Sequence, residues 1–138
     1  MVNGYLVDRS ALARLHLAPV RDVLVPMMDR ALVSMCGVTE LELLSSARTT
    51  ADRVRVKTML NEALEWVDTP EDLWDRASEL QAVLTSRARD HATSIASLVV
   101  AVTAQDLGLT VLHYNADFDA IAEHTGQATH WVVPAGVV

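Results

Sequence analysis

The sequence contains little cysteine, proline or glycine. Among its 138 residues there is one cysteine, Cys36, so a disulfide within the chain is excluded. Cys36 lies in the apolar run 31–38, where we expect a buried small hydrophobic side chain rather than a nucleophile. With 4 prolines and 5 glycines, the connections between regular elements are predicted to be short.

Long hydrophobic runs are also missing. No apolar segment approaches the length that spans a bilayer, and the first residues lack the basic region and apolar core of a signal peptide. We therefore expect a cytoplasmic protein that makes no membrane contact. The hydrophobic fraction of 51% argues against disorder, and a length of 138 residues suits one domain with one core.

Basic residues are outnumbered by acidic ones, 11 to 18, which gives a net charge of −7. A surface that coats nucleic acid would be basic, so that class of protein is disfavoured. A nuclease with an acidic metal pocket remains compatible, because a bound cation meets the phosphate there. An acidic surface also suits a basic protein partner.

Several catalytic motifs are absent from the sequence. The five histidines are scattered, and neither a His-x-x-x-His pair nor a pair of cysteines is available for a zinc site. There is no phosphate-binding loop, no G-x-G-x-x-G and no G-x-S-x-G. His113 stands close to the candidate acid Asp117, and we expect it to have a structural role.

Strand and helix patterns alternate along the chain. Short apolar runs predict strands over 5–8, 31–36, 64–67, 109–112 and 129–133. Helices are predicted over 11–16, 19–30, from about 40, 50–60, 70–85, 94–106 and 117–125, with Ser10, Thr39 and Thr49 or Thr50 as N-caps and a polar loop over 87–93. The segment 94–106 is apolar on nearly all sides, which predicts a buried central helix. The alternation predicts an α/β fold with a mostly parallel sheet covered on both faces.

Three carboxylates stand where such a sheet places its chemistry. Asp8 ends the first predicted strand, Glu42 lies in the first turns of a helix that follows a strand, and Asp117 follows the fourth strand. Together they could hold Mg²⁺ or Mn²⁺, which take oxygen ligands and activate water for attack on a phosphodiester. Each also has an ordinary alternative role: a turn aspartate for Asp8, a solvated helix residue for Glu42 and a helix cap for Asp117.

Two further groups of residues have both a structural and a functional interpretation. One group is solvated surface or guides RNA phosphates toward the acids: Arg48, Arg53, Arg55, Lys57, Arg87 and Arg89. The apolar stripe within Val20–Met28 is core, or in part a groove for a partner or a dimer contact.

Four segments, in order, resemble the motifs of the PIN domain family. They are Tyr5–Leu12 (YLVDRSAL), Val38–Leu44 (VTELELL), Ser94–Ala104 (SIASLVVAVTA) and Leu112–Ala122 (LHYNADFDAIA). Their order and spacing cover nearly the whole chain. Within that family, the segments resemble most the VapC-type toxins of bacterial toxin–antitoxin pairs.

The resemblance implies a three-layer α/β/α sandwich, with a single PIN domain over residues 1–138 and Mg²⁺-dependent cleavage of RNA. It also implies a homodimer inhibited by a VapB-type antitoxin, whose tail enters the acidic groove. On the matching positions, Asp8 would be a metal ligand and Ser10 the small polar residue beside it. Glu42 would be the second acid, since the Glu-Leu-Leu register favours it over Glu40.

This chain departs from the family pattern at two positions. The third motif normally has an aspartate where this chain has Ser97, and the fourth normally reads His-Tyr-Asp-x-Asp-Phe, where this chain has Asn115. The metal and the catalysis would then depend on Asp8, Glu42 and Asp117, with Ser97 and Asn115 orienting water or substrate. Losing two charged ligands should weaken metal binding and raise the pKa of a bound water.

Two hypotheses of function follow. The first is an active ribonuclease toxin. The second is a catalytically impaired PIN domain, natural or engineered, that binds an antitoxin or RNA without cutting. A purely structural dimerisation module is a third idea, but it gives no reason for the three acids to stand at the family's positions.

Overall fold

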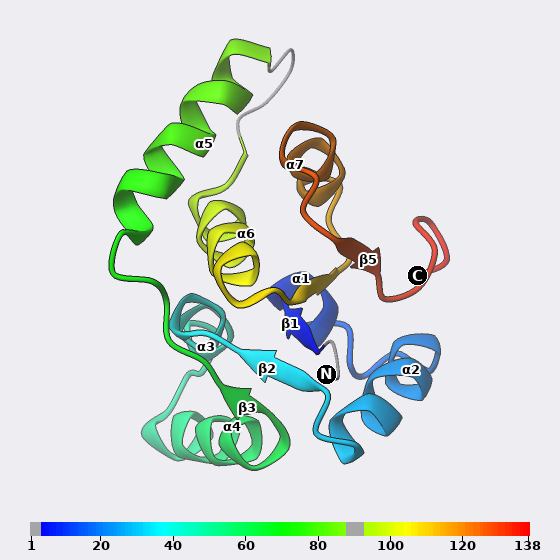
Figure 1. Ribbon diagram of the computed structural model, residues 1–138. Coiled ribbons are helices and arrows are strands. Elements are labelled where there is room, and N and C mark those ends of the chain that lie inside the picture. Colours follow the sequence, from blue (N-terminus) through cyan, green and yellow to red (C-terminus); the bar gives the residue numbers. More distant parts are fainter. Residues whose placement is uncertain (1–3, 88–92) are drawn as a thin grey trace.

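The computed structural model describes residues 4–87 and 93–138, in which a five-stranded sheet lies between two layers of helices (Figure 1). All strands are parallel and lie in the order β3-β2-β1-β4-β5. Their bounds are β1 Tyr5–Val7, β2 Val33–Met35, β3 Glu65–Trp66, β4 Thr110–His113 and β5 Thr129–Trp131. The predicted α/β sandwich with a parallel sheet is confirmed.

Helices cover both faces of this sheet. On one side are α1 (Arg9–Leu12), α2 (Ala18–Asp29) and α4 (Thr50–Ala63); on the other are α5 (Leu73–Arg87), α6 (Ile95–Leu107) and α7 (Asp117–Thr125). The remaining helix, α3 (Gly37–Leu44), contacts α1, α4 and α6. The helices therefore bury both faces of the sheet, as a parallel sheet requires.

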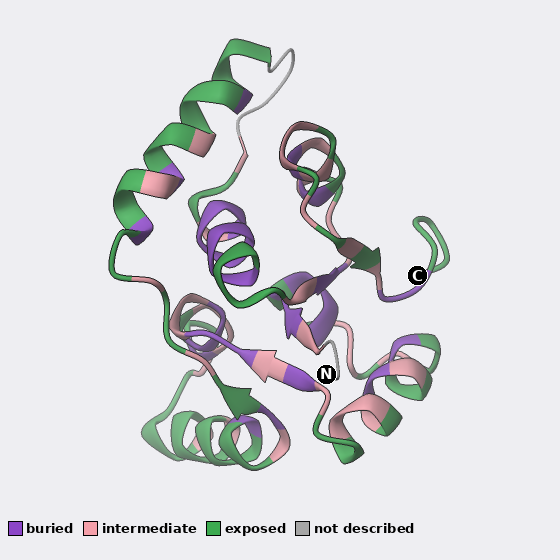
Figure 2. Cartoon of the chain, in the orientation of Figure 1, coloured by how far each residue is buried: buried purple, intermediate pink, exposed green. Residues whose placement is uncertain are grey.

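The apolar core is divided in two by the alternation of side chains along the strands. Leu6 and Val111 belong to the core under α5, α6 and α7. Their neighbours Val7 and Leu112 belong to the core under α1, α2 and α4. Successive strand residues point to opposite faces, so a short apolar run supplies both cores. Figure 2 shows the contrast between the buried α6 and the exposed outer side of α4.

The central helix α6 is as apolar and buried as the sequence predicts. Every residue from Ser97 to Ala104 is buried. Ser94 caps the first turn, and the helix ends at Gly108, whose φ of +66° is a left-handed conformation that favours glycine. Among the described helices, none combines the length and apolar character needed to cross a bilayer.

The apolar stripe of α2 is core. Val20 and Leu24 are fully buried, and their half-buried neighbours pack against the same cluster: Val23, Met27 and Met28. Cys36 is also fully buried, and this burial raises the pKa of its thiol. Cys36 therefore lacks the thiolate character of a nucleophile, and its expected packing role is confirmed.

Two predicted N-caps are wrong, while a third, Thr49, caps α4 as predicted. The first helix begins at Arg9 and is capped by Asp8, so Ser10 lies inside it. The helix α3 begins at Gly37, so Thr39 lies in its first turn rather than before it. Both Ser10 and Thr39 are buried. Serine and threonine commonly cap helices, but here both side chains pack against the core and each helix begins before them.

Other helix boundaries also shift. The segment from Pro70 to Asp72 is a turn, in which the Leu73 N–H donates to the Pro70 carbonyl at 3.1 Å, and α5 begins only at Leu73. This helix continues to Arg87, the first residue of the loop predicted over 87–93, and the loop residues 88–92, among them Arg89 and His91, lie outside the described residues. Asp117 is the first residue of α7 and not its cap, because Ala116 holds the N-cap position.

The packing of α6 yields a stability prediction from two leucines on one helix. Leu98 is 2% exposed and Leu107 is 44% exposed. Leu98→Ala should lower the free energy of unfolding by about 2–5 kcal/mol, because a cavity forms in the core. Leu107→Ala should change it by only about 0.5 kcal/mol. Urea denaturation measures both variants, and equal losses would contradict the central position of α6.

Candidate active site

Asp8 is held firmly where β1 ends. Its backbone N–H donates to the Leu112 carbonyl of β4 at 2.9 Å, which continues the sheet pairing past the last strand residue. The side chain is nearly buried and its Oδ2 accepts hydrogen bonds from the Ser10 N–H at 3.0 Å and the Ser10 hydroxyl at 2.6 Å. Its Oδ1 accepts no hydrogen bond from any described residue, so one carboxylate oxygen is left for a ligand.

Ser10 connects two strands of the site. Its hydroxyl donates to Asp8 and accepts a hydrogen bond from the Tyr114 N–H at 2.8 Å. Tyr114 directly follows β4, so this single hydroxyl fixes the exit of β1 relative to the exit of β4. Ser10 therefore holds the Asp8 carboxylate in position.

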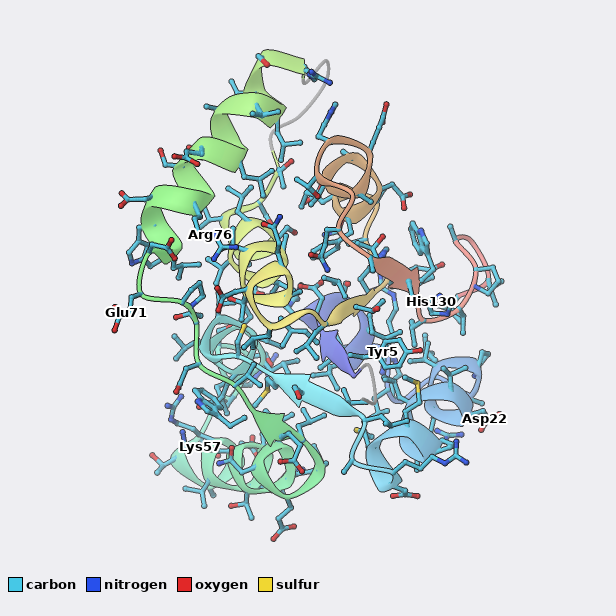
Figure 3. All side chains as sticks on the ribbon, viewed as in Figure 1. Tyr5, Asp22, Lys57, Glu71, Arg76 and His130 are labelled. Atoms are coloured by element: carbon cyan, nitrogen blue, oxygen red, sulfur yellow. The ribbon has the colours of Figure 1, made fainter. Side chains whose placement is uncertain are left out.

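The two glutamates of α3 have different environments. Glu42 is half-buried and lines a pocket together with Asp8. Burial raises the pKa of Glu42, the negative charge of Asp8 raises it further, and the positive charge of Arg9 partly opposes the rise. Glu40 is buried and bound at 2.8 Å by Lys57 of α4, a side chain labelled in Figure 3. Glu40 therefore ties α3 to α4, and Glu42 is left to the pocket.

A chain of hydroxyl groups connects the start of α6 with Asp117. The Ser94 hydroxyl donates to the Ser97 hydroxyl at 2.9 Å, and the Ser97 hydroxyl donates to Asp117 Oδ2 at 3.2 Å. The Ser94 N–H donates to the same carboxylate oxygen at 3.2 Å. The Asp117 carboxylate is thus stabilised by hydrogen bonds from the Ser97 hydroxyl in α6 and from the N–H of its N-cap, Ser94.

The turn between β4 and α7 is organised by Asn115. Its side-chain oxygen accepts a hydrogen bond from the Asp117 N–H at 2.9 Å, and its own N–H donates to His113 Nδ1 at 3.1 Å. An Asn side chain that accepts from the backbone two residues on is a common turn device. Asn115 therefore both shapes this turn and reaches the pocket.

These side chains meet in a pocket of about 200 Å³. It is lined by Asp8, Arg9, Ser10, Glu42, Ser94, Ala96, Ser97 and Asn115. Five of the six predicted site residues are in this lining. The sixth, Asp117, is connected to the pocket through Ser97 rather than lining it. Arg9 was not predicted as a site residue from the sequence. Its position between Asp8 and Ser10 is the signal that could have identified it.

The pocket offers oxygen atoms that fit a hard divalent cation. Carboxylates come from Asp8 and Glu42, and neutral oxygens come from Ser97 and Asn115. Mg²⁺ usually binds one or two protein carboxylates and keeps several waters, so this donor set suits it. Within the described residues, no three acidic, histidine or cysteine side chains are grouped closely enough to hold a metal. Water would therefore have to complete the coordination shell.

Several predicted basic residues have partners away from this pocket. Arg55 pairs with Asp52 at 3.2 Å, and Arg87 Nη1 lies 2.9 Å from His124 Nδ1. Together with the Lys57–Glu40 pair, these contacts place Arg55, Arg87 and Lys57 on helix surfaces, while Arg53 is exposed on α4 and Arg48 is exposed before that helix begins. Among the described residues, the basic side chain in the pocket lining is that of Arg9.

His113 is buried beneath the Asn115 turn. Its ring lies between those of Phe118 and Trp131, with centroids 4.9 and 5.0 Å away. Its Nε2 has no hydrogen-bond partner among the described residues. Burial lowers the pKa of His113 to about 4, and Asp119 opposes that shift while His130 adds to it. His113 is therefore a neutral structural residue near pH 7.

The chain matches the model of the PIN domain over residues 5–124. It is 42% identical over 136 residues to Ribonuclease VapC21 of Mycobacterium tuberculosis H37Rv, an alignment that covers 99% of each chain. It is 35% identical over 138 residues to Ribonuclease VapC51 of the same strain, which covers 100% of this chain and 99% of the relative.

Two solved structures have the same fold. The DNA-bound VapBC of Salmonella typhimurium superposes with a TM-score of 0.74 at 14% identity, over 96% of this chain and 100% of that one. VapBC-5 of Mycobacterium tuberculosis superposes with a TM-score of 0.64 at 21% identity, over 94% and 97%.

The buried His113 predicts a pH dependence of stability. In the unfolded chain it binds a proton near pH 6.5, whereas in the folded chain it does so only near pH 4. Between these two pH values the unfolded state therefore binds more protons than the folded state. The free energy of unfolding should fall as the pH falls through this range, by up to about 3 kcal/mol.

Urea denaturation across this window tests the effect. His113→Asn keeps an acceptor for the Asn115 N–H but does not titrate, so its stability should fall less than that of the wild type. His16→Gln, which removes an exposed histidine, serves as the control and should follow the wild type. A constant difference between His113→Asn and wild type at every pH would contradict the prediction.

Proposed function

This chain belongs to the PIN domain family and, within it, to the VapC ribonucleases, and we propose on that basis that it is the toxin of a type II toxin–antitoxin system. Its activity is Mg²⁺-dependent endonucleolytic cleavage of RNA, with Mn²⁺ as an alternative ion. The observation that carries this proposal is the pair of carboxylates, Asp8 and Glu42, that line one pocket at the carboxyl edge of the sheet.

Asp8 and Glu42 hold the divalent cation in this proposal. Their mutual repulsion contributes to the raised pKa of Glu42, and a bound cation would relieve it. When bound, such an ion supplies positive charge that polarises water and the scissile phosphate for hydrolysis. The donor set supports Mg²⁺ because two carboxylates with several waters are its usual environment.

Neutral residues of the chain orient the other participants. Ser10 holds the Asp8 carboxylate in one rotamer through its 2.6 Å hydrogen bond. Ser97 and Asn115 present a hydroxyl and an amide at the pocket, where they position water or the RNA backbone. Asp117 contributes negative charge from behind Ser97 and would act on the ion through Ser97 or through water.

The same proposal includes a set of partners and a location. A VapB-type antitoxin is supported by the solved structures with the same fold, which are of VapBC. RNA is the substrate, since the curated relatives are named ribonucleases. We further propose that residues 1–138 form one domain, that the toxin is a homodimer and that it acts in the cytoplasm.

Cleavage of RNA by the purified, antitoxin-free chain tests this function. Discrete products should appear with Mg²⁺ or Mn²⁺ and vanish with EDTA. Asp8→Asn should reduce cleavage at least about 100-fold, because it removes a charged metal ligand. Asp22→Asn is the matched control, since Asp22 is exposed on α2 (Figure 3) and its replacement should leave cleavage unchanged. Undiminished cleavage by Asp8→Asn with Mg²⁺ present would refute the metal assignment.

A second candidate function is favoured by the environment of Asp117. A serine at position 97 can donate a hydrogen bond to Asp117, whereas an aspartate there would face it as a second negative charge. Ser97 thus removes one reason for a cation to bind. The alternative is a catalytically impaired PIN domain that binds an antitoxin or RNA without cutting.

Restoring the two family acids distinguishes these functions. If the alternative holds, Ser97→Asp with Asn115→Asp should create Mg²⁺-dependent cleavage that the wild type lacks, and should tighten Mn²⁺ binding about 10-fold or more in a titration. Ser86→Asp on the exposed side of α5 controls for added charge. Wild-type cleavage equal to that of the restored variant would rule out the impaired toxin.

A further inference from the structure

We propose that Arg9 binds a phosphate of the RNA at the mouth of the acidic pocket, as a substrate-binding residue supplied by this chain's first helix. The inference rests on the proposed function, since it names a contact between that same site and its substrate. It goes further by assigning Arg9, the one basic side chain among the described residues of the pocket lining, to the substrate rather than to the fold.

The placement of Arg9 is the first observation. It lies between Asp8, which caps α1, and Ser10, which holds the Asp8 carboxylate, and it lines the pocket with both of them. The side chain is exposed and forms no hydrogen bond or ion pair with any described residue. Arg9 is thus a free cation beside two carboxylates without being the ion-pair partner of either.

Other arginines of the molecule show what a structural role looks like here. Arg14, one turn further along, donates to the Ser10 carbonyl at 2.8 Å and lies 4.5 Å from the centre of the Tyr114 ring. Arg76 reaches from α5 to α6, where it binds Asp106 at 2.9 Å (Figure 3). Arg9 has no contacts of this kind with the residues that the structure describes, so its five N–H donors are available to a ligand.

Phosphate is the ligand chemistry that this arrangement favours. A guanidinium group presents a planar fork of donors that binds two phosphate oxygens at once. The pocket carries Asp8 and Glu42, while Ser97 and Asn115 are neutral. With fewer negative charges in the lining, an approaching phosphodiester meets less repulsion, and Arg9 offsets part of what remains.

Binding of a fluorescently labelled oligoribonucleotide of mixed sequence, in EDTA to prevent cleavage, tests this inference across a series of salt concentrations. Arg9→Gln should weaken binding about 10-fold and lower the slope of log affinity against log salt by about 1, which corresponds to one lost phosphate contact. Arg9→Lys should restore the slope but only part of the affinity, because a point charge replaces the fork.

Arg30→Gln is the matched control, because Arg30 is an exposed arginine at the end of α2, where the chain approaches the amino end of β2. It should bind RNA as the wild type does. Thermal melting should be unchanged in all three variants, which separates lost binding from lost folding. In the cleavage assay, Arg9→Gln should raise KM by a similar factor.

Three results would overturn the proposal. If the wild type binds RNA and Arg9→Gln binds with the same affinity, salt slope and KM, Arg9 has no contact with substrate, although the proposed function stands. If Arg9→Gln weakens only the binding of an acidic peptide, the residue serves a protein partner instead. A folded wild type that neither binds nor cleaves RNA would overturn both this inference and the proposed function.

Discussion

All five strands of the sheet run in one direction, and the geometry of the site depends on this constraint. Because β1, β2 and β4 end at the same edge, Asp8, Glu42 and Asn115 reach one pocket although they are far apart in the sequence. The Ser10 hydroxyl then fixes two of these exits to each other, by donating to Asp8 and accepting from the Tyr114 N–H. If β4 were antiparallel, Asn115 would lie at the opposite edge of the sheet and could not line the pocket.

The acids around this edge differ in how their charge is balanced. Glu40 is neutralised by Lys57, and Asp117 is stabilised by Ser97 and the Ser94 N–H. Asp8 and Glu42 remain as a pair of like charges in one pocket, and the pKa of Glu42 rises through burial and through the charge of Asp8. The repulsion between these two carboxylates is the basis of the proposed cation site. Arg9 lines the same pocket, so a phosphate bound by Arg9 would lie close to a cation bound by the two carboxylates.

The candidate site was largely predictable because its residues lie in short segments with a regular order. The strand at Tyr5 and the buried helix after Ser94 follow from apolar patterning, and the resemblance of four segments pointed to the acids and to Ser97 and Asn115. The caps at Ser10 and Thr39 were mispredicted, because both side chains are buried by packing that local preferences do not describe.

The sequence alone determined the alternation of strands and helices and the residue types at the site, whereas the division of the expected single core into two became visible only in the tertiary structure. Only the tertiary structure decided which acids face the pocket. Two features of the site depend on side chains that the fold brings together from β1, β4 and α6. They are the hydrogen bond from the Ser97 hydroxyl to Asp117 and the surroundings of Arg9 in the pocket. The physical reason is that charge acts over a few ångströms of space, so its balance is set by contacts between segments that are distant in the chain.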